Sequence, residues 1–233
     1  MKPNSRVIIH LGINFILAPC PNLTAIHRLA FQQAILEEGL EYQRVTNQAD
    51  KFIITRETQP PLEITIAPIN QPQIGQLLIV SSQPKGSLSL ELFIAEAEAV
   101  ARAFLKTWPR PVYQILSNDL AIKELHETSG EHAFQEIWEE RLHQSQKSLD
   151  IFNRPILGGG LRFVMPPLQS DPAPKQIEIK IESFLKNTNN IYIELQVSYP
   201  EPAVCNGPFE IGMQMKDANQ FLEQQVYSFI TGE

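Results

Sequence analysis

The sequence has 233 residues, of which 43% are hydrophobic, and carries 19 basic against 26 acidic side chains for a formal net charge of −7 at pH 7. A chain of this size can bury a sizeable core, either as one large domain or as two modules of roughly 100–120 residues. Nucleic acid and anionic membranes are disfavoured as partners, because phosphate groups repel an acidic surface and the basic residues form no local cluster.

The N-terminal stretch of residues 1–21 begins with a basic residue and continues with an apolar run, which His10 and Asn14 interrupt. A signal peptide needs an unbroken apolar core and a small-residue cleavage site, and a membrane span needs about 18 apolar residues. We therefore expect a cytoplasmic protein without a membrane partner. Cys20 and Cys205 are too far apart for a disulfide framework and lack metal-ligand spacing, so we expect two reduced thiols, with a regulatory disulfide as the alternative.

The first half of the chain predicts a strand, a helix, four strands and a second helix. Alternation of Leu62, Ile64 and Ile66 with polar residues is typical of a half-buried strand, and Pro109 stops the second helix. In chain order the predicted elements are a strand at 6–18, a helix at 22–39, a hairpin at 40–45 and 51–58, strands at 62–66 and 76–82, and a helix at 88–108.

The second half repeats this element order without repeating the residues. Ile177, Ile179 and Ile181 alternate with charged residues, and the following segment shows the same pattern. In chain order the predicted elements are a strand at 112–116, a helix at 131–147, strands at 161–165, 176–183, 191–198 and 209–213, and a helix at 218–230.

Alternating strands joined by short turns predict antiparallel sheets with helices packed on one face. The sequence thus predicts an α+β protein of two similar modules, residues 1–110 and 111–233, packed into one globular unit. Each module has the order strand, helix, three or four antiparallel strands, helix.

This element order resembles the doubled saddle of the TATA-binding protein, by topology alone. The resemblance does not extend to DNA binding, since a DNA-binding saddle needs basic and apolar residues on its concave face. The outward strand positions of this sequence are mostly acidic: Glu63, Glu178, Lys180, Glu182 and Glu194.

One group of metal-ligating residue types lies in the predicted helix at 131–147. His132, Glu136, Glu139 and His143 fall within an arc of about 60° on an ideal helix, and such residues can hold zinc or a di-iron centre. The alternative is the solvent face of an amphipathic helix whose other side is apolar, and the sequence favours it. No catalytic motif is recognisable, so the catalytic residues stay unknown and no cofactor is expected.

Three consecutive glycines, Gly158, Gly159 and Gly160, raise the question of a phosphate-binding loop. Such loops open a helix, whereas these glycines precede the strand predicted at 161–165. Glycines in that position more often permit a bulge or the close approach of another backbone. Arg162 follows them directly and could present its charge to a ligand, so these four residues are the candidate ligand-binding residues.

Two functions remain open. We favour a non-catalytic binding or assembly protein that acts through a sheet face or edge on a protein partner, which can be a second copy of itself. The alternative is a small-ligand-binding or enzyme module with a pocket between sheet and helices near Arg162.

Overall fold

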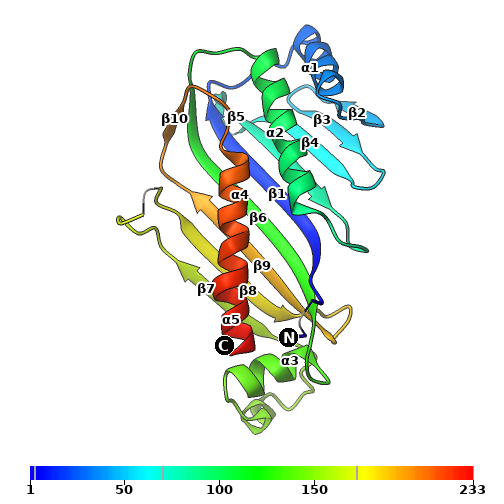
Figure 1. Ribbon diagram of the computed structural model, residues 1–233, viewed down its shortest axis with the longest axis vertical. Helices are drawn as coiled ribbons and strands as arrows, with labels where there is room; N and C mark the ends of the chain where they lie inside the picture. The colour runs from blue at the N-terminus through cyan, green and yellow to red at the C-terminus, as the bar shows by residue number, and fades with distance from the viewer. Residues whose placement is uncertain (3, 70, 172, 233) are drawn as a thin grey trace.

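The computed structural model describes residues 1–2, 4–69, 71–171 and 173–232, which fold around one large antiparallel sheet (Figure 1). The strands are β1 Val7–Ala18, β2 Arg44–Asn47, β3 Phe52–Arg56, β4 Leu62–Ile69, β5 Gln71–Ser82, β6 Tyr113–Glu127, β7 Gly160–Met165, β8 Gln176–Ser183, β9 Asn190–Tyr199 and β10 Ala203–Cys205. The helical segments are α1 Ala25–Glu37, α2 Leu90–Thr107, α3 Ala133–Gln135, η1 Glu136–Arg141, η2 Gln146–Phe152, α4 Ile211–Phe221, η3 Leu222–Val226 and α5 Tyr227–Thr231. The predicted α+β class with antiparallel strands is confirmed.

The strand order is β2-β3-β4-β5-β1-β6-β9-β8-β7, and β10 pairs with one end of β6. The long strands β1 and β6 pair with each other along most of their length at the middle of the sheet. Each of them also pairs with a strand from its own half of the chain, β5 with β1 and β9 with β6. The sheet is therefore continuous from the first half of the chain to the second.

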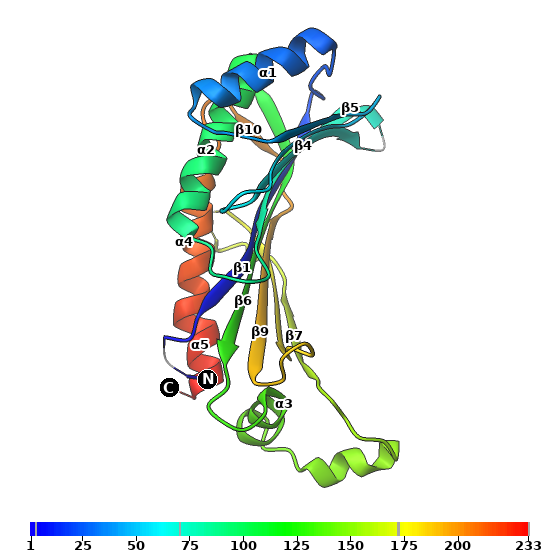
Figure 2. The same ribbon diagram turned by 90° about the vertical axis from the view of Figure 1, so that its right-hand side faces the viewer.

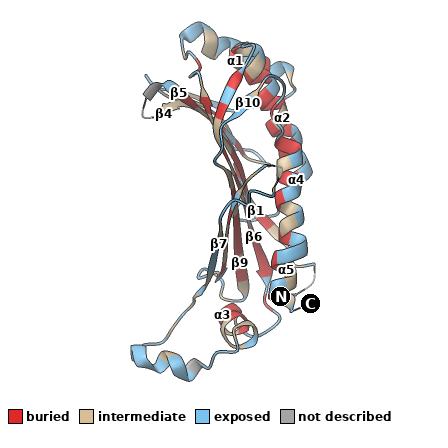
Figure 3. Ribbon diagram, turned by 90° about the vertical axis from the view of Figure 1, so that its left-hand side faces the viewer, coloured by how far each residue is buried: buried red, intermediate tan, exposed pale blue. Residues whose placement is uncertain are grey.

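The helices α1, α2 and α4–α5 lie on the same face of this sheet (Figure 2). Side chains alternate along a strand, so Leu11, Ile13 and Phe15 of β1 point together to one face and are buried. Buried residues lie where sheet and helices meet (Figure 3), among them Val100 and Phe104 of α2. The opposite side of the sheet, called the open face below, is covered by no helix over the central strands in the described residues.

The strand predicted at 112–116 is only the beginning of β6, which continues to Glu127. Asn118 and Asp119 interrupt the apolar alternation, and Glu124 and His126 occupy helix-facing positions that normally hold apolar residues. Pairing with β1 on one side and β9 on the other extends the strand through these residues. Tertiary pairing here overrides the sequence pattern.

The strand predicted at 209–213 is wrong, because a helix begins at Ile211. The C-terminal helical segment starts seven residues earlier than the predicted 218, and the last strand is β10. Spacings of three and four residues place one buried stripe along the helix. Its members are Ile211, Met215, Ala218, Leu222, Val226 and Ile230.

The part of the chain that the structure describes contains no helix with both the length and the apolar character needed to cross a membrane. Cys20 and Cys205 are both half-buried free thiols.

Candidate functional site

The three glycines lead into β7, the last strand of the sheet. A Cβ atom on Gly160 would lie 2.6 Å from the Cα of Glu182 and even closer to the carbonyl oxygen of Ile181. The amide of Gly159 donates a hydrogen bond of 3.0 Å to the hydroxyl of Ser183, which also lies on β8. The glycine run thus lets the chain approach β8 closely, and no helix begins after it.

Arg162 lies on β7 and is already paired on the sheet surface. Its guanidinium forms a bidentate ion pair with Glu178 of β8, in which Nε donates to Oε1 at 2.8 Å and Nη2 donates to Oε2 at 2.8 Å. The hydrogen bonds from Arg162 lower the pKa of the Glu178 carboxyl. The candidate role of Arg162 as a free charge for a ligand therefore competes with this pair.

The pair belongs to a charged row that crosses four strands of the open face and consists of Arg162, Glu178, Lys180, Glu194 and Lys123. Glu194 lies 3.2 Å from the ammonium of Lys123 and 3.5 Å from that of Lys180. It lies on the outward face of the sheet, as its position in the alternation predicts, but only 6% of it is exposed. Its neighbours across the sheet cover it, and their charges compensate the buried carboxylate.

His10 lies beside this row and, with Gly12, lines a hollow of about 320 Å³ on the open face. The Nδ1 of His10 is 2.6 Å from the hydroxyl of Ser82. Burial, and next the positive charge of Lys123, lower the pKa of His10 to about 4.

We expect Lys123→Met to raise the pKa of His10 in the folded protein, because it removes a nearby positive charge. A titration of the imidazole resonances by NMR measures this. Folding stability should also fall as the pH drops from about 6.5 to about 4, since the unfolded chain takes up the proton first. Lys2→Met, far along the chain from this row, is the control, and an unchanged His10 titration in Lys123→Met would contradict the stated cause.

The four candidate metal-ligating residues do not share one helical face. The continuous helix predicted at 131–147 is wrong, because α3 is one short turn followed by the π-helical η1, with a hydrogen bond of 3.1 Å from the Leu142 amide to the Ile137 carbonyl. His132 caps α3 by accepting a hydrogen bond from the Phe134 amide, and His143 adopts a positive φ of 52° after η1.

Glu136 is fully buried instead of facing solvent. Its carboxylate accepts hydrogen bonds from the Thr128 hydroxyl and, at 2.7 Å, from the Ser129 amide, and it pairs with the amino group of Met1. Glu139 accepts a hydrogen bond from Gln135. These contacts draw Glu136 inward, so the structure does not bring the four residues together; the described residues contain no group of three or more metal-ligating side chains.

A buried ionisable cluster, called the Glu124 network, lies between the sheet and α5. Glu124 accepts hydrogen bonds from Arg6 Nε at 2.8 Å and from the Tyr227 hydroxyl at 2.7 Å, and His126 Nε2 lies 2.8 Å from it. Burial would raise the pKa of Glu124, but His126 and Arg6 together lower it below the ordinary value. Sequence spacing does not indicate this network, because its members lie on β6, on α5 and at the residue directly before β1.

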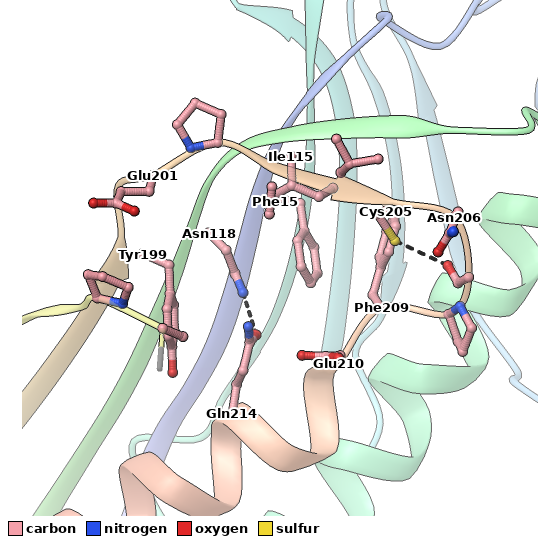
Figure 4. A pocket seen from close by; sticks show the side chains of 17 residues that line it. Phe15, Ile115, Asn118, Tyr199, Glu201, Cys205, Asn206, Phe209, Glu210 and Gln214 are labelled. Carbon is pink, nitrogen blue, oxygen red and sulfur yellow. Dashed lines mark hydrogen bonds between the residues drawn. The ribbon is translucent and has the colours of Figure 1, made fainter. Parts of the chain in front are cut away.

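A pocket of about 610 Å³ lies between β10, the end of β9 and the beginning of α4 (Figure 4). We call it the β10 pocket. Its lining includes three aromatic side chains, one amide and two carboxylates: Phe15, Tyr199, Phe209, Asn118, Glu201 and Glu210. Burial, with the negative charges of Asp217 and Glu210, raises the pKa of Tyr199 to about 12. The pocket is distant from Arg162 along the sheet, and sequence reasoning missed it because its residues come from five separate segments.

The outer edge of β7 is the second feature suited to binding. The Ser183 amide donates to the Gly159 carbonyl at 3.0 Å, so alternation turns the N–H and C=O groups of Gly160, Arg162 and Val164 away from β8. Phe163 and Val164 are 38% and 53% exposed. Large exposed apolar side chains also occur in the segments that flank the strand: Ile151, Phe152, Leu157 and Leu168.

Comparisons with known proteins identify no family for this chain. No protein-family model matches it, and no curated protein does. Among solved structures it has a match to DynU16, described as a protein in the dynemicin biosynthetic locus, with 9% sequence identity, a TM-score of 0.22 and coverage of 84% of this chain and 87% of that chain. A similarity this weak carries no argument about fold or function.

Proposed function

We propose that this protein is a non-catalytic binding and assembly protein that forms a homodimer through the edge of β7. The observation that carries the proposal is that β7 ends the sheet while its outward N–H and C=O groups have no strand beside them in the described residues. Such an edge pairs readily with another strand, since each pairing satisfies backbone groups.

A second copy of the same strand fits this edge well. A two-fold axis at Phe163 would pair β7 with itself in antiparallel fashion, with Phe163 opposite Phe163 of the second copy. Leu161 would then oppose Met165, and Arg162 would oppose Val164. This register avoids two arginines facing each other, which would be unfavourable. Because Glu178 already neutralises Arg162, two acidic chains would meet without local repulsion.

The first test is the mass in solution. Light scattering at micromolar concentration should give about twice the 26.4 kDa chain mass for the wild type. Val164→Pro should weaken dimerisation at least about tenfold, because proline removes an outward N–H while the pairing with β8 is kept. Val164→Ala is the matched control and should stay dimeric. A monomeric wild type at this concentration would contradict the proposal.

The second test concerns the register. In the Cys20→Ser, Cys205→Ser background, Phe163→Cys should form a disulfide-linked dimer under mild oxidation. Facing residues of a non-hydrogen-bonded pair lie about 4.5 Å apart at Cα, within the range that a disulfide spans. Arg162→Cys should not cross-link in this register, so efficient cross-linking of Arg162→Cys alone would refute it.

We further propose that residues 1–110 and 111–233 are two related modules arranged like the halves of the TATA-binding protein, without its DNA-binding role. Support comes from the central β1–β6 pair, where each strand opens one half of the chain. We place the dimer in the cytoplasm on the strength of the two free thiols.

A further inference from the structure

We infer that the β10 pocket binds a small organic ammonium ion with an aromatic or similarly apolar body. This binding would be additional to dimerisation and does not depend on it. Three properties of the pocket carry the inference: its charge, an unpartnered buried oxygen and its aromatic walls.

The charge of the pocket is negative. Glu201 and Glu210 both line it, and none of the described lining residues is a lysine, arginine or histidine. Neither carboxylate has an ion-pair partner among the described residues. Helix α4 begins at the pocket, but Glu210 stands at its N-cap position, so the positive end of the helix meets a carboxylate. An anionic ligand would be repelled there, and a cation would be attracted.

The buried oxygen belongs to Asn118 of β6, which is 3% exposed and lines the pocket. Its Nδ2 donates a hydrogen bond to Gln214 of α4 (Figure 4). Its Oδ1 is buried and accepts no hydrogen bond within the described part of the chain. A buried acceptor without a donor is costly, and an ammonium N–H would supply the donor. An ammonium group would therefore both donate a hydrogen bond to the Asn118 oxygen and neutralise the charge of the two carboxylates.

The walls suit an aromatic body. Phe15 and Phe209 pack against each other with their ring centroids 4.6 Å apart and their planes tilted by 39°, and Tyr199 lines the same pocket. A volume of about 610 Å³ falls within the range of small-molecule sites. Aromatic faces also attract organic cations. A bare metal ion fits less well, because no three metal-ligating side chains gather anywhere in the described residues.

The test compares three probes with one ring system: tryptamine, a cation, tryptophol, its neutral alcohol, and indole-3-propionate, an anion. In titration calorimetry at pH 7, tryptamine should bind at least about tenfold more tightly than tryptophol, and indole-3-propionate should not bind. Equal binding of tryptophol and tryptamine, preference for the anion, or no binding of tryptamine at millimolar concentration would each overturn the inference.

Substitutions of pocket residues test whether tryptamine binds in the β10 pocket. Glu210→Gln and Glu201→Gln should each weaken tryptamine binding about fivefold and leave tryptophol binding unchanged. Glu41→Gln, an exposed carboxylate outside the pocket, is the control and should change neither. Asn118→Leu should weaken tryptamine about tenfold, with the melting temperature measured to show that the variant folds. Retention of wild-type affinity by Glu201→Gln, Glu210→Gln and Asn118→Leu would overturn the inference.

The rate of alkylation of Cys205 provides a test that does not depend on measuring the affinity for tryptamine. Cys205 lines the pocket, whereas Cys20 does not belong to its lining. Saturating tryptamine should slow alkylation of Cys205 by iodoacetamide several-fold and leave the rate at Cys20 unchanged. Equal rates at Cys205 with and without tryptamine would place any binding elsewhere and refute the site.

Discussion

Replacing Glu124 with leucine is expected to lower the free energy of unfolding by about 3–5 kcal/mol, the cost of breaking a buried ion pair. Glu124 is 0% exposed, and its carboxylate holds Arg6, His126 and Tyr227 at once. With leucine at this position, the guanidinium of Arg6 would keep only its hydrogen bonds to Asn219 of α4 and Glu223 of η3. Urea unfolding followed by circular dichroism measures the change.

The control for this variant is Glu127→Leu. Glu127 pairs with Lys2 at the surface, where both side chains are more than half exposed, so the expected loss is below about 1 kcal/mol. A loss in Glu124→Leu no larger than in this control would contradict the structural role of the network.

The pH dependence of stability provides a second measurement on the same variant. The folded pKa of Glu124 lies below its ordinary value of 4.5, so its contribution is present above pH 4.5 and is lost as the pH falls through the folded pKa. Glu124→Leu lacks this contribution at every pH. The stability difference between wild type and variant should therefore shrink in acid.

The second large effect is expected at Gly160. Gly160→Ala should destabilise the protein by about 3 kcal/mol, because the added methyl group would collide with the backbone of β8 at Ile181 and Glu182. The nearest atoms on both residues belong to the backbone of a paired strand, which cannot move aside as a flexible side chain can. The loss should appear in urea unfolding and as faster amide hydrogen exchange along β7.

Gly207→Ala is the matched control, because a Cβ atom there would meet nothing within 4 Å. Its effect should be within about 0.5 kcal/mol. If both alanine variants unfold at the same urea concentration, close approach to β8 does not explain the glycine.

The sequence pattern predicts a strand best where one face is buried and the other is wet. The segments predicted at 176–183 and 191–198 are β8 and β9 with nearly unchanged bounds. It fails where tertiary contacts place polar side chains inside. The spacing of Glu136 is typical of a solvent-facing helix position, yet its carboxylate is buried and accepts hydrogen bonds from Thr128 and Ser129.

The candidate sites also differ in whether the sequence could predict them. The role of the glycines before β7 was open to prediction, because their order relative to the strand is visible in the chain. The β10 pocket was not, since Asn118 and Gln214 meet only after β6 and α4 pack together. No spacing rule connects residues 96 positions apart.

The central pairing of β1 with β6 has a consequence for synthesis on the ribosome. The first half of the chain can emerge and fold β1 against β5 long before β6 has been made. Until then the other side of β1 stays open along nearly its whole length, and such an edge invites pairing with neighbouring nascent chains. The most vulnerable moment of this protein therefore precedes completion of Glu127, and a chaperone that shields a long apolar strand would be of most use at that point.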